Sequence, residues 1–85
     1  MKQNTTGDNM INANELMAFL KDGCIVVDTR FVGQNGYPYY WRMFGNFKYV
    51  FCGDGWRPVC RIDKQFLIDE LSDWDDEAIY FIGLV

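Results

Sequence analysis

The chain has 85 residues, a length that folds as one domain. A hydrophobic fraction of 49% and an aromatic fraction of 18% are high enough to build a core, which excludes an intrinsically disordered acidic tail. Eight basic and twelve acidic side chains give a net charge of -4, which disfavours a simple binder of duplex DNA or of an anionic membrane.

The two ends of the chain differ in polarity. Residues 1–9 are polar with a single lysine, so we expect a flexible N-terminal arm followed by one domain over residues 10–85. The arm lacks the apolar stretch of a secretory signal, and the longest apolar run, residues 78–85, is too short to span a membrane. We therefore expect a cytoplasmic protein that makes no contact with a membrane.

The first predicted element is a helix over residues 13–22. Asn12 is a favourable N-cap, and Glu15 three residues later completes a capping box. Apolar side chains then recur at helical spacing, and Gly23 is a typical C-terminal stop.

From Cys24 onward, β-branched and aromatic runs alternate with glycine-containing turns, which predicts a hairpin meander. Gly45 and Asn46 are expected to form a two-residue hairpin turn with a positive φ at the glycine. Pro58 cannot donate a hydrogen bond to a neighbouring strand, so its strand is expected at an edge of the sheet. The four predicted strands cover residues 24–32, 37–44, 47–52 and 56–62.

A second helix is predicted over residues 64–72, with Asp63 as its N-cap. Residues 78–85 are apolar on both alternations, which predicts a fifth strand. The second helix can carry the chain back across the sheet and place this strand antiparallel to the first. The predicted fold is α+β, in the order α-β-β-β-β-α-β, with an antiparallel sheet of strand order 5-1-2-3-4 and both helices on one face.

Alternation along the strands divides the side chains between two faces of the sheet. Both faces are too apolar to be left to water, and two short helices can cover only one of them. The first predicted face carries Val26, Tyr37, Tyr39, Trp41, Met43, Val50, Cys52, Trp56, Cys60 and Ile62, interrupted by Asp28, Arg30 and Lys48. The second carries an aromatic and basic set, Tyr40, Arg42, Phe44, Phe47, Tyr49, Arg57 and Arg61, with Ile25, Val27, Phe31, Phe51 and Val59.

The uncovered face and the fifth strand both call for a partner surface. A strand that is apolar on both alternations should not lie bare at a sheet edge. Either the sheet curls until the fifth strand meets the fourth, or two copies pair edge to edge as a homodimer, which we favour. The predicted core consists of Leu16, Phe19, Leu20, Val27, Phe66, Leu71 and Phe81.

Several kinds of reaction chemistry are missing from the sequence. It contains no histidine, which excludes Ser-His and Cys-His nucleophile pairs and imidazole acid-base catalysis. Three cysteines without a C-x-x-C spacing argue against a disulfide framework and an ordinary zinc site. The Gly-x-Gly sequence at residues 53–55 lacks the downstream glycine or lysine of a phosphate-binding loop and is explained by a hairpin turn. The alternating acidic residues at 73–77 lack the glycine and closing glutamate of a calcium-binding loop. We therefore expect no enzyme activity, no metal and no cofactor.

Charge is segregated along the sequence. Residues 30–64 carry six basic and two acidic side chains, a balance of +4, whereas residues 65–85 carry six acidic side chains and no basic one. The acidic set is either the solvated side of the second helix and its loop, or a patch that meets a basic site on another macromolecule. It consists of Asp69, Glu70, Asp73, Asp75, Asp76 and Glu77.

Two binding functions remain. The first is a small inhibitor or immunity-type module that blocks an enzyme or a nucleic-acid-handling machine of a host or competitor through acidic and aromatic groups. Size, acidity and aromatic content are compatible with the small proteins that phages and mobile elements use against host or defence enzymes, an analogy of composition alone. The alternative is binding of single-stranded nucleic acid to the aromatic and basic set, which the negative net charge disfavours.

Overall fold

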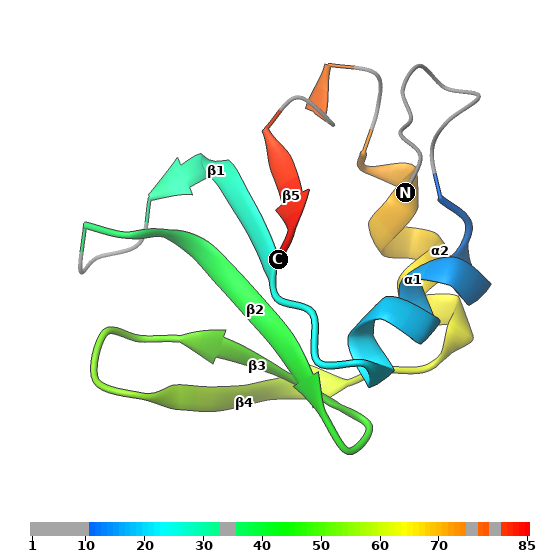
Figure 1. Cartoon of the computed structure of the whole chain (residues 1–85), viewed down its shortest axis with the longest axis horizontal. Helices are drawn as coiled ribbons and strands as arrows, with labels where there is room; N and C mark the ends of the chain where they lie inside the picture. The colour runs from blue at the N-terminus through cyan, green and yellow to red at the C-terminus, as the bar shows by residue number, and fades with distance from the viewer. Residues whose placement is uncertain (1–10, 33–35, 75–76, 79–80) are drawn as a thin grey trace.

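The structure is a computed structural model that describes residues 11–32, 36–74, 77–78 and 81–85. Over these residues the chain forms two α-helices and one five-stranded antiparallel sheet (Figure 1). The element order and the α+β class match the prediction. The predicted N-terminal arm lies outside the described residues. The elements are α1 (Ala13–Lys21), β1 (Val26–Val32), β2 (Pro38–Phe44), β3 (Phe47–Phe51), β4 (Trp56–Arg61), α2 (Lys64–Ser72) and β5 (Ile82–Leu84).

Side-chain caps fix the starts of both helices. The Asn12 Oδ1 accepts from the Glu15 backbone N–H at 2.8 Å, and the Glu15 Oε1 accepts from the Asn12 N–H at 2.9 Å, which confirms the predicted capping box. The Asp63 Oδ1 accepts from the Phe66 N–H at 2.8 Å at the start of α2, as expected.

The strands lie in the order β4-β3-β2-β1-β5, and β5 is antiparallel to β1, both as predicted. The hairpin between β2 and β3 pairs Phe44 with Phe47 and turns through Gly45, whose φ of 59° is the positive value that the turn requires. Pro58 lies in the edge strand β4. Because β4 and β5 occupy opposite edges, the alternative in which the fifth strand meets the fourth is wrong. Edge-to-edge pairing of two copies stays a prediction.

The last strand is shorter than predicted. It spans Ile82–Leu84, whereas the apolar run predicts a strand over residues 78–85. The Phe81 N–H donates to the Ala78 carbonyl oxygen at 2.8 Å, so the chain is still turning just before the strand begins. The apolar run therefore includes the residues that lead into the strand as well as the strand itself.

The core lies between the helices and one face of the sheet. Figure 1 shows α1 beside α2, and their buried side chains meet β1 and β2 at Val26, Trp41 and Met43. Burial of Leu16 and Leu20 is as predicted, whereas Phe81 is 43% exposed and Val27 is half-buried on the opposite face. The remaining predicted core residues, Phe19, Phe66 and Leu71, are half-buried.

A β-bulge in β4 changes the predicted division of the two faces. Lys48 pairs with Cys60, as expected, but the next residue of β3 pairs with Pro58, so Val59 has no partner across the ladder. Because of this extra residue, the residues of β4 that precede Val59 lie on the opposite face from the one that simple alternation predicts. Trp56 therefore lies on the second face, and Arg57 lies opposite Val50 on the core side, the reverse of the predicted placement.

Candidate functional site

The face of the sheet opposite the helices carries a connected group of aromatic rings. Centroids of Phe44 and Tyr49 lie 4.9 Å apart, and those of Phe51 and Trp56 lie 5.4 Å apart. The two pairs are joined by Phe44 and Trp56, whose centroids lie 6.4 Å apart. Tyr37 and Tyr40 contact Phe51, with centroid distances of 6.0 and 6.1 Å. No helix or strand of the described residues packs on this face. We call this group the ring cluster; it consists of Tyr37, Tyr40, Phe44, Tyr49, Phe51 and Trp56.

Strand register assembles the ring cluster. Trp41 and Met43 of β2 point into the core, so the residues between and after them point the other way. Cross-strand partners share a face, so the β3 residues paired with these outward-pointing residues lie on the same face. The bulge in β4 adds Trp56, which pairs with Phe51. Alternation alone missed Trp56 and Tyr37. A proline in an edge strand was the available signal for the bulge.

The rings pack mostly edge to face. The interplanar angle is 85° between Phe44 and Tyr49, 79° between Phe44 and Trp56, and 64° between Tyr37 and Phe51. This geometry places the positive edge of one ring on the negative face of the next. The rings therefore hold one another in place, and one face of Phe44 is taken by the Arg42 guanidinium.

Arg42 lies within the ring cluster. Its guanidinium carbon is 4.5 Å from the Phe44 ring centroid and 5.6 Å from that of Trp56, both within cation–π range. One Nη donates a long hydrogen bond of 3.4 Å to the Gly23 carbonyl oxygen, and the buried Nε has no hydrogen-bond partner. Arg42 forms no ion pair with any described residue. The ring cluster thus contains a cation whose hydrogen-bonding capacity is largely unused.

The rim of the ring cluster is apolar and basic. Phe47 is exposed beside Phe44, and Arg61 is exposed at the position paired with Phe47. The paired strand residues of this face include Arg42 and Arg61 and no carboxylate. The face therefore carries positive charge, although the chain as a whole carries a net charge of -4.

Most of the predicted aromatic and basic set is brought together on this face. The exception is Arg57, because the bulge turns it to the core side. Its Nη2 lies 3.5 Å from an Asp54 carboxylate oxygen in the adjoining turn, and both side chains are exposed. The members that the structure places together are Tyr40, Arg42, Phe44, Phe47, Tyr49 and Arg61.

The predicted acidic set lies apart from the ring cluster. Asp69 and Glu70 belong to α2, and Asp73 is its C-cap, so these residues sit in the helix layer. Asp69 accepts a hydrogen bond of 3.0 Å from the Gln65 side chain, a contact within the helix. Glu77 is exposed, and Asp75 and Asp76 lie outside the described residues. The described members of the acidic set, Asp69, Glu70, Asp73 and Glu77, therefore do not form one surface with the ring cluster.

Two charged side chains that the sequence places on the first face, as interruptions of its apolar pattern, are buried on the core side. Lys48 is 8% exposed, with its Nζ 4.8 Å from the Trp41 ring centroid, 5.2 Å from Tyr39 and 5.6 Å from Phe66. Asp28 is 5% exposed and accepts from Arg30, with 2.6 Å between the closest nitrogen and oxygen. Both are buried charges that contact groups of this chain, aromatic rings for Lys48 and Arg30 for Asp28.

The described part of the chain forms neither a disulfide nor a cluster of metal-ligating side chains. All three cysteines are free thiols, and these residues contain no cluster of three or more metal-ligating side chains. None of the described helices has the length and apolar character needed to cross a membrane. No family model, curated protein or solved structure matches this chain.

Proposed function

We propose that this chain is a small protein-binding module of the inhibitor or immunity type, and that it contacts its partner through the ring cluster. One observation carries the proposal: six aromatic rings and a stacked arginine form a connected surface that no described helix or strand covers. Tyr, Trp and Arg are the residues that most often dominate the binding energy of protein interfaces. The composition and the openness of this face together support docking onto another protein.

Size is compatible with this role. A standard interface buries about 800 Å² on each partner, a modest part of the 5432 Å² that the chain exposes. The module would inhibit by covering a functional surface of its partner, a mode of action that needs no reacting group. Size and composition favour a protein that is encoded by a phage or mobile element and acts against a host or defence enzyme.

Two matched charge insertions test the proposal. Phe47 at the rim of the ring cluster is 42% exposed, and Ile68 on α2 is 44% exposed, so neither substitution removes a core contact. We expect Phe47→Glu to abolish capture of the cognate partner from lysate of the source cells, and Ile68→Glu to retain it. A partner that remains bound to Phe47→Glu would contradict the proposal.

The acidic set offers a second contact surface and is tested in the same assay. Reversal of two exposed carboxylates, Asp69→Lys with Asp73→Lys, changes the charge of the helix layer and leaves the ring cluster intact. We expect this double variant to capture the partner. Loss of capture here, with capture retained by Phe47→Glu, would place the contact on the acidic set.

Single-stranded nucleic acid is the other candidate ligand of the ring cluster, because the face carries two arginines and no carboxylate. Edge-to-face rings and the net charge of -4 weigh against it. An oligothymidylate of about twenty nucleotides gives the direct comparison. Binding that weakens steeply with salt and is lost in Phe47→Glu would favour nucleic acid over a protein partner.

A further inference from the structure

We infer that the partner of the ring cluster is an acidic protein segment that places a carboxylate against Arg42, with apolar side chains on the surrounding rings. This inference rests on the proposed function and names the chemistry of the partner. Its basis is the charge of the face: the two arginines there form no ion pair with a described residue, and no carboxylate stands among the paired strand residues around them.

The other arginines of the strands provide an internal comparison. Arg30 and Arg57 each have an aspartate of this chain within ion-pair distance, at 2.6 Å and 3.5 Å. Arg42 has none among the described residues, although it is half-buried and lies against the rings of Phe44 and Trp56. A half-buried guanidinium gains most from a carboxylate, because the surrounding low dielectric strengthens the pair.

Stacking prepares Arg42 for this contact. The rings of Phe44 and Trp56 hold the guanidinium carbon at 4.5 Å and 5.6 Å. Guanidinium N–H groups point outward in the plane of the group, where they match the two oxygens of a carboxylate. The one hydrogen bond recorded for the terminal nitrogens is the long one to Gly23. The buried Nε is out of reach of a partner, so an incoming carboxylate would meet the terminal nitrogens, which the ring contacts hold in position.

The same observations disfavour the other occupants. Stacked bases need open ring faces, whereas one face of Phe44 carries Arg42 and the rings contact one another edge to face. Two arginines would also neutralise few phosphates. A second copy docked face to face about a two-fold axis would bring the same positive face against itself. An acidic protein segment satisfies both the charge and the apolar surface.

Selection from a displayed library of random peptides of about twelve residues tests the inference even while the cognate partner is unidentified. The immobilised chain is panned, and the selected peptides are measured in solution. We expect enrichment of Asp and Glu beside apolar residues, and weakening of their affinity by about thirty-fold or more in Arg42→Gln. Arg42→Lys keeps the charge and loses the planar fork, so we expect an intermediate loss.

Two further variants serve as controls. Arg61→Gln removes an exposed rim charge of the same face and is expected to weaken binding by about two- to five-fold. Arg57→Gln removes an exposed arginine of the other face and should leave affinity within about two-fold. Thermal unfolding of each variant separates loss of contact from loss of fold, and Arg61→Gln decides the result if Arg42→Gln fails to fold.

Each contrary outcome identifies what has failed. The carboxylate inference would be overturned if the selected peptides were neutral or basic. If such peptides also failed to bind Phe47→Glu, the proposed function would still stand. Peptides that ignore Phe47→Glu would overturn both. Oligothymidylate binding that Arg42→Gln abolishes would make the occupant a nucleic acid. A dimer that Arg42→Gln dissociates would make it a second copy.

Discussion

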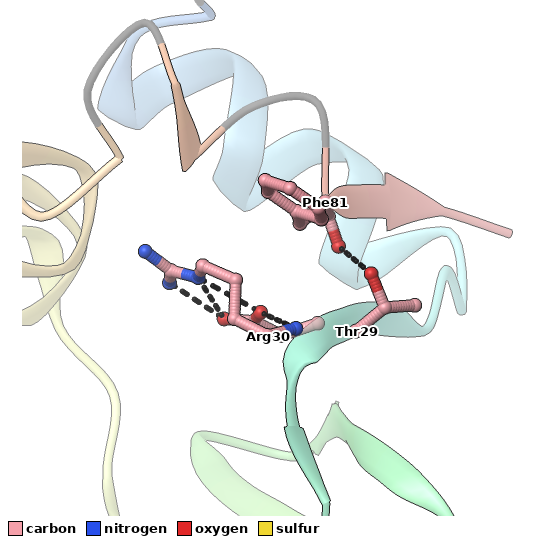
Figure 2. Close-up of polar contacts among 4 residues, drawn as sticks. Thr29, Arg30 and Phe81 are labelled. Carbon is pink, nitrogen blue, oxygen red and sulfur yellow. Dashed lines mark hydrogen bonds and ion pairs between the residues drawn. The ribbon is translucent and has the colours of Figure 1, made fainter.

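Asp28 and Arg30 in β1 form an ion pair that is joined by several hydrogen bonds. The Arg30 Nε donates to Asp28 at 2.9 Å, and the Arg30 backbone N–H donates to the same carboxylate at 3.0 Å. Figure 2 shows this arginine next to Thr29, whose hydroxyl donates to the Phe81 carbonyl oxygen at 3.1 Å across to the chain before β5. These contacts tie the middle of β1 to the C-terminal segment.

Removal of the Asp28 charge should destabilise the protein. Asp28→Asn takes an ion-pair partner from Arg30 at a buried position, which we expect to cost about 1–3 kcal/mol of unfolding free energy. Asp54→Asn breaks a solvent-exposed pair and should cost less than about 1 kcal/mol. Urea unfolding measures both, and equal costs would show that burial of the Asp28 pair contributes nothing.

The same pair makes stability depend on pH. Burial alone would raise the pKa of Asp28, but hydrogen bonds from the Arg30 side chain and backbone, together with its charge, leave that pKa below its ordinary value. The carboxylate therefore stabilises the fold above the unfolded pKa of about 3.9, and this contribution is lost as pH falls through the lower folded pKa. We expect the stability difference between wild type and Asp28→Asn to be constant from about pH 5 to 7 and to narrow below about pH 4. A difference that widens on acidification would contradict this assignment.

Lys48 is a second buried charge whose contacts are aromatic. Its ammonium lies near rings from β2 and from α2, so it links the sheet to the second helix. Lys48→Met keeps a long flexible side chain and should change stability by about 1 kcal/mol or less. Lys48→Glu places a carboxylate against ring faces and should cost about 2–4 kcal/mol. Similar unfolding free energies for the two variants would show that the ring faces at this position do not discriminate against a carboxylate.

At the scale of elements, local signals carried most of the prediction. Helix caps and the glycine turn between β2 and β3 depend only on residues a few positions apart. They could therefore be predicted from the sequence without knowledge of the fold. The bulge at Val59 and the shortness of β5 depend on which strands are neighbours, and alternation within one strand contains no such information. This is why the aromatic and basic set was predicted correctly in β2 and β3, whereas in β4 Arg57 and Trp56 were each placed on the wrong face.

The helix layer gives a test of element packing. Phe66 of α2 contacts the Trp41 ring edge to face at 6.2 Å and lies beside Lys48, whereas Phe81 is exposed. We expect Phe66→Ala to cost about 2–4 kcal/mol and Phe81→Ala less than about 1 kcal/mol. The sequence alone predicts that both lie in the core. A large loss of unfolding free energy in Phe81→Ala would restore that prediction.

At the scale of the molecule, the protein consists of one layer of helices and one sheet, with the core between them. Composition predicted that one sheet face would lack cover, because two short helices cannot cover both. Which face is covered depended on where α1 and α2 pack, and the buried Trp41 and Met43 show that it is the face opposite the ring cluster. The acidic residues of α2 lie in the helix layer, whereas Arg42 and Arg61 lie on the sheet face that no described helix covers.

Shift mapping by two-dimensional ¹⁵N–¹H NMR tests most directly whether the open face is the contact surface. The labelled chain is titrated with its captured partner, or with a selected peptide if the partner is too large. We expect amide shift changes concentrated in residues 40–51 and 56–61, with none above background in α2. Changes confined to α2 and the residues that follow it would contradict the account and place binding on the helix layer.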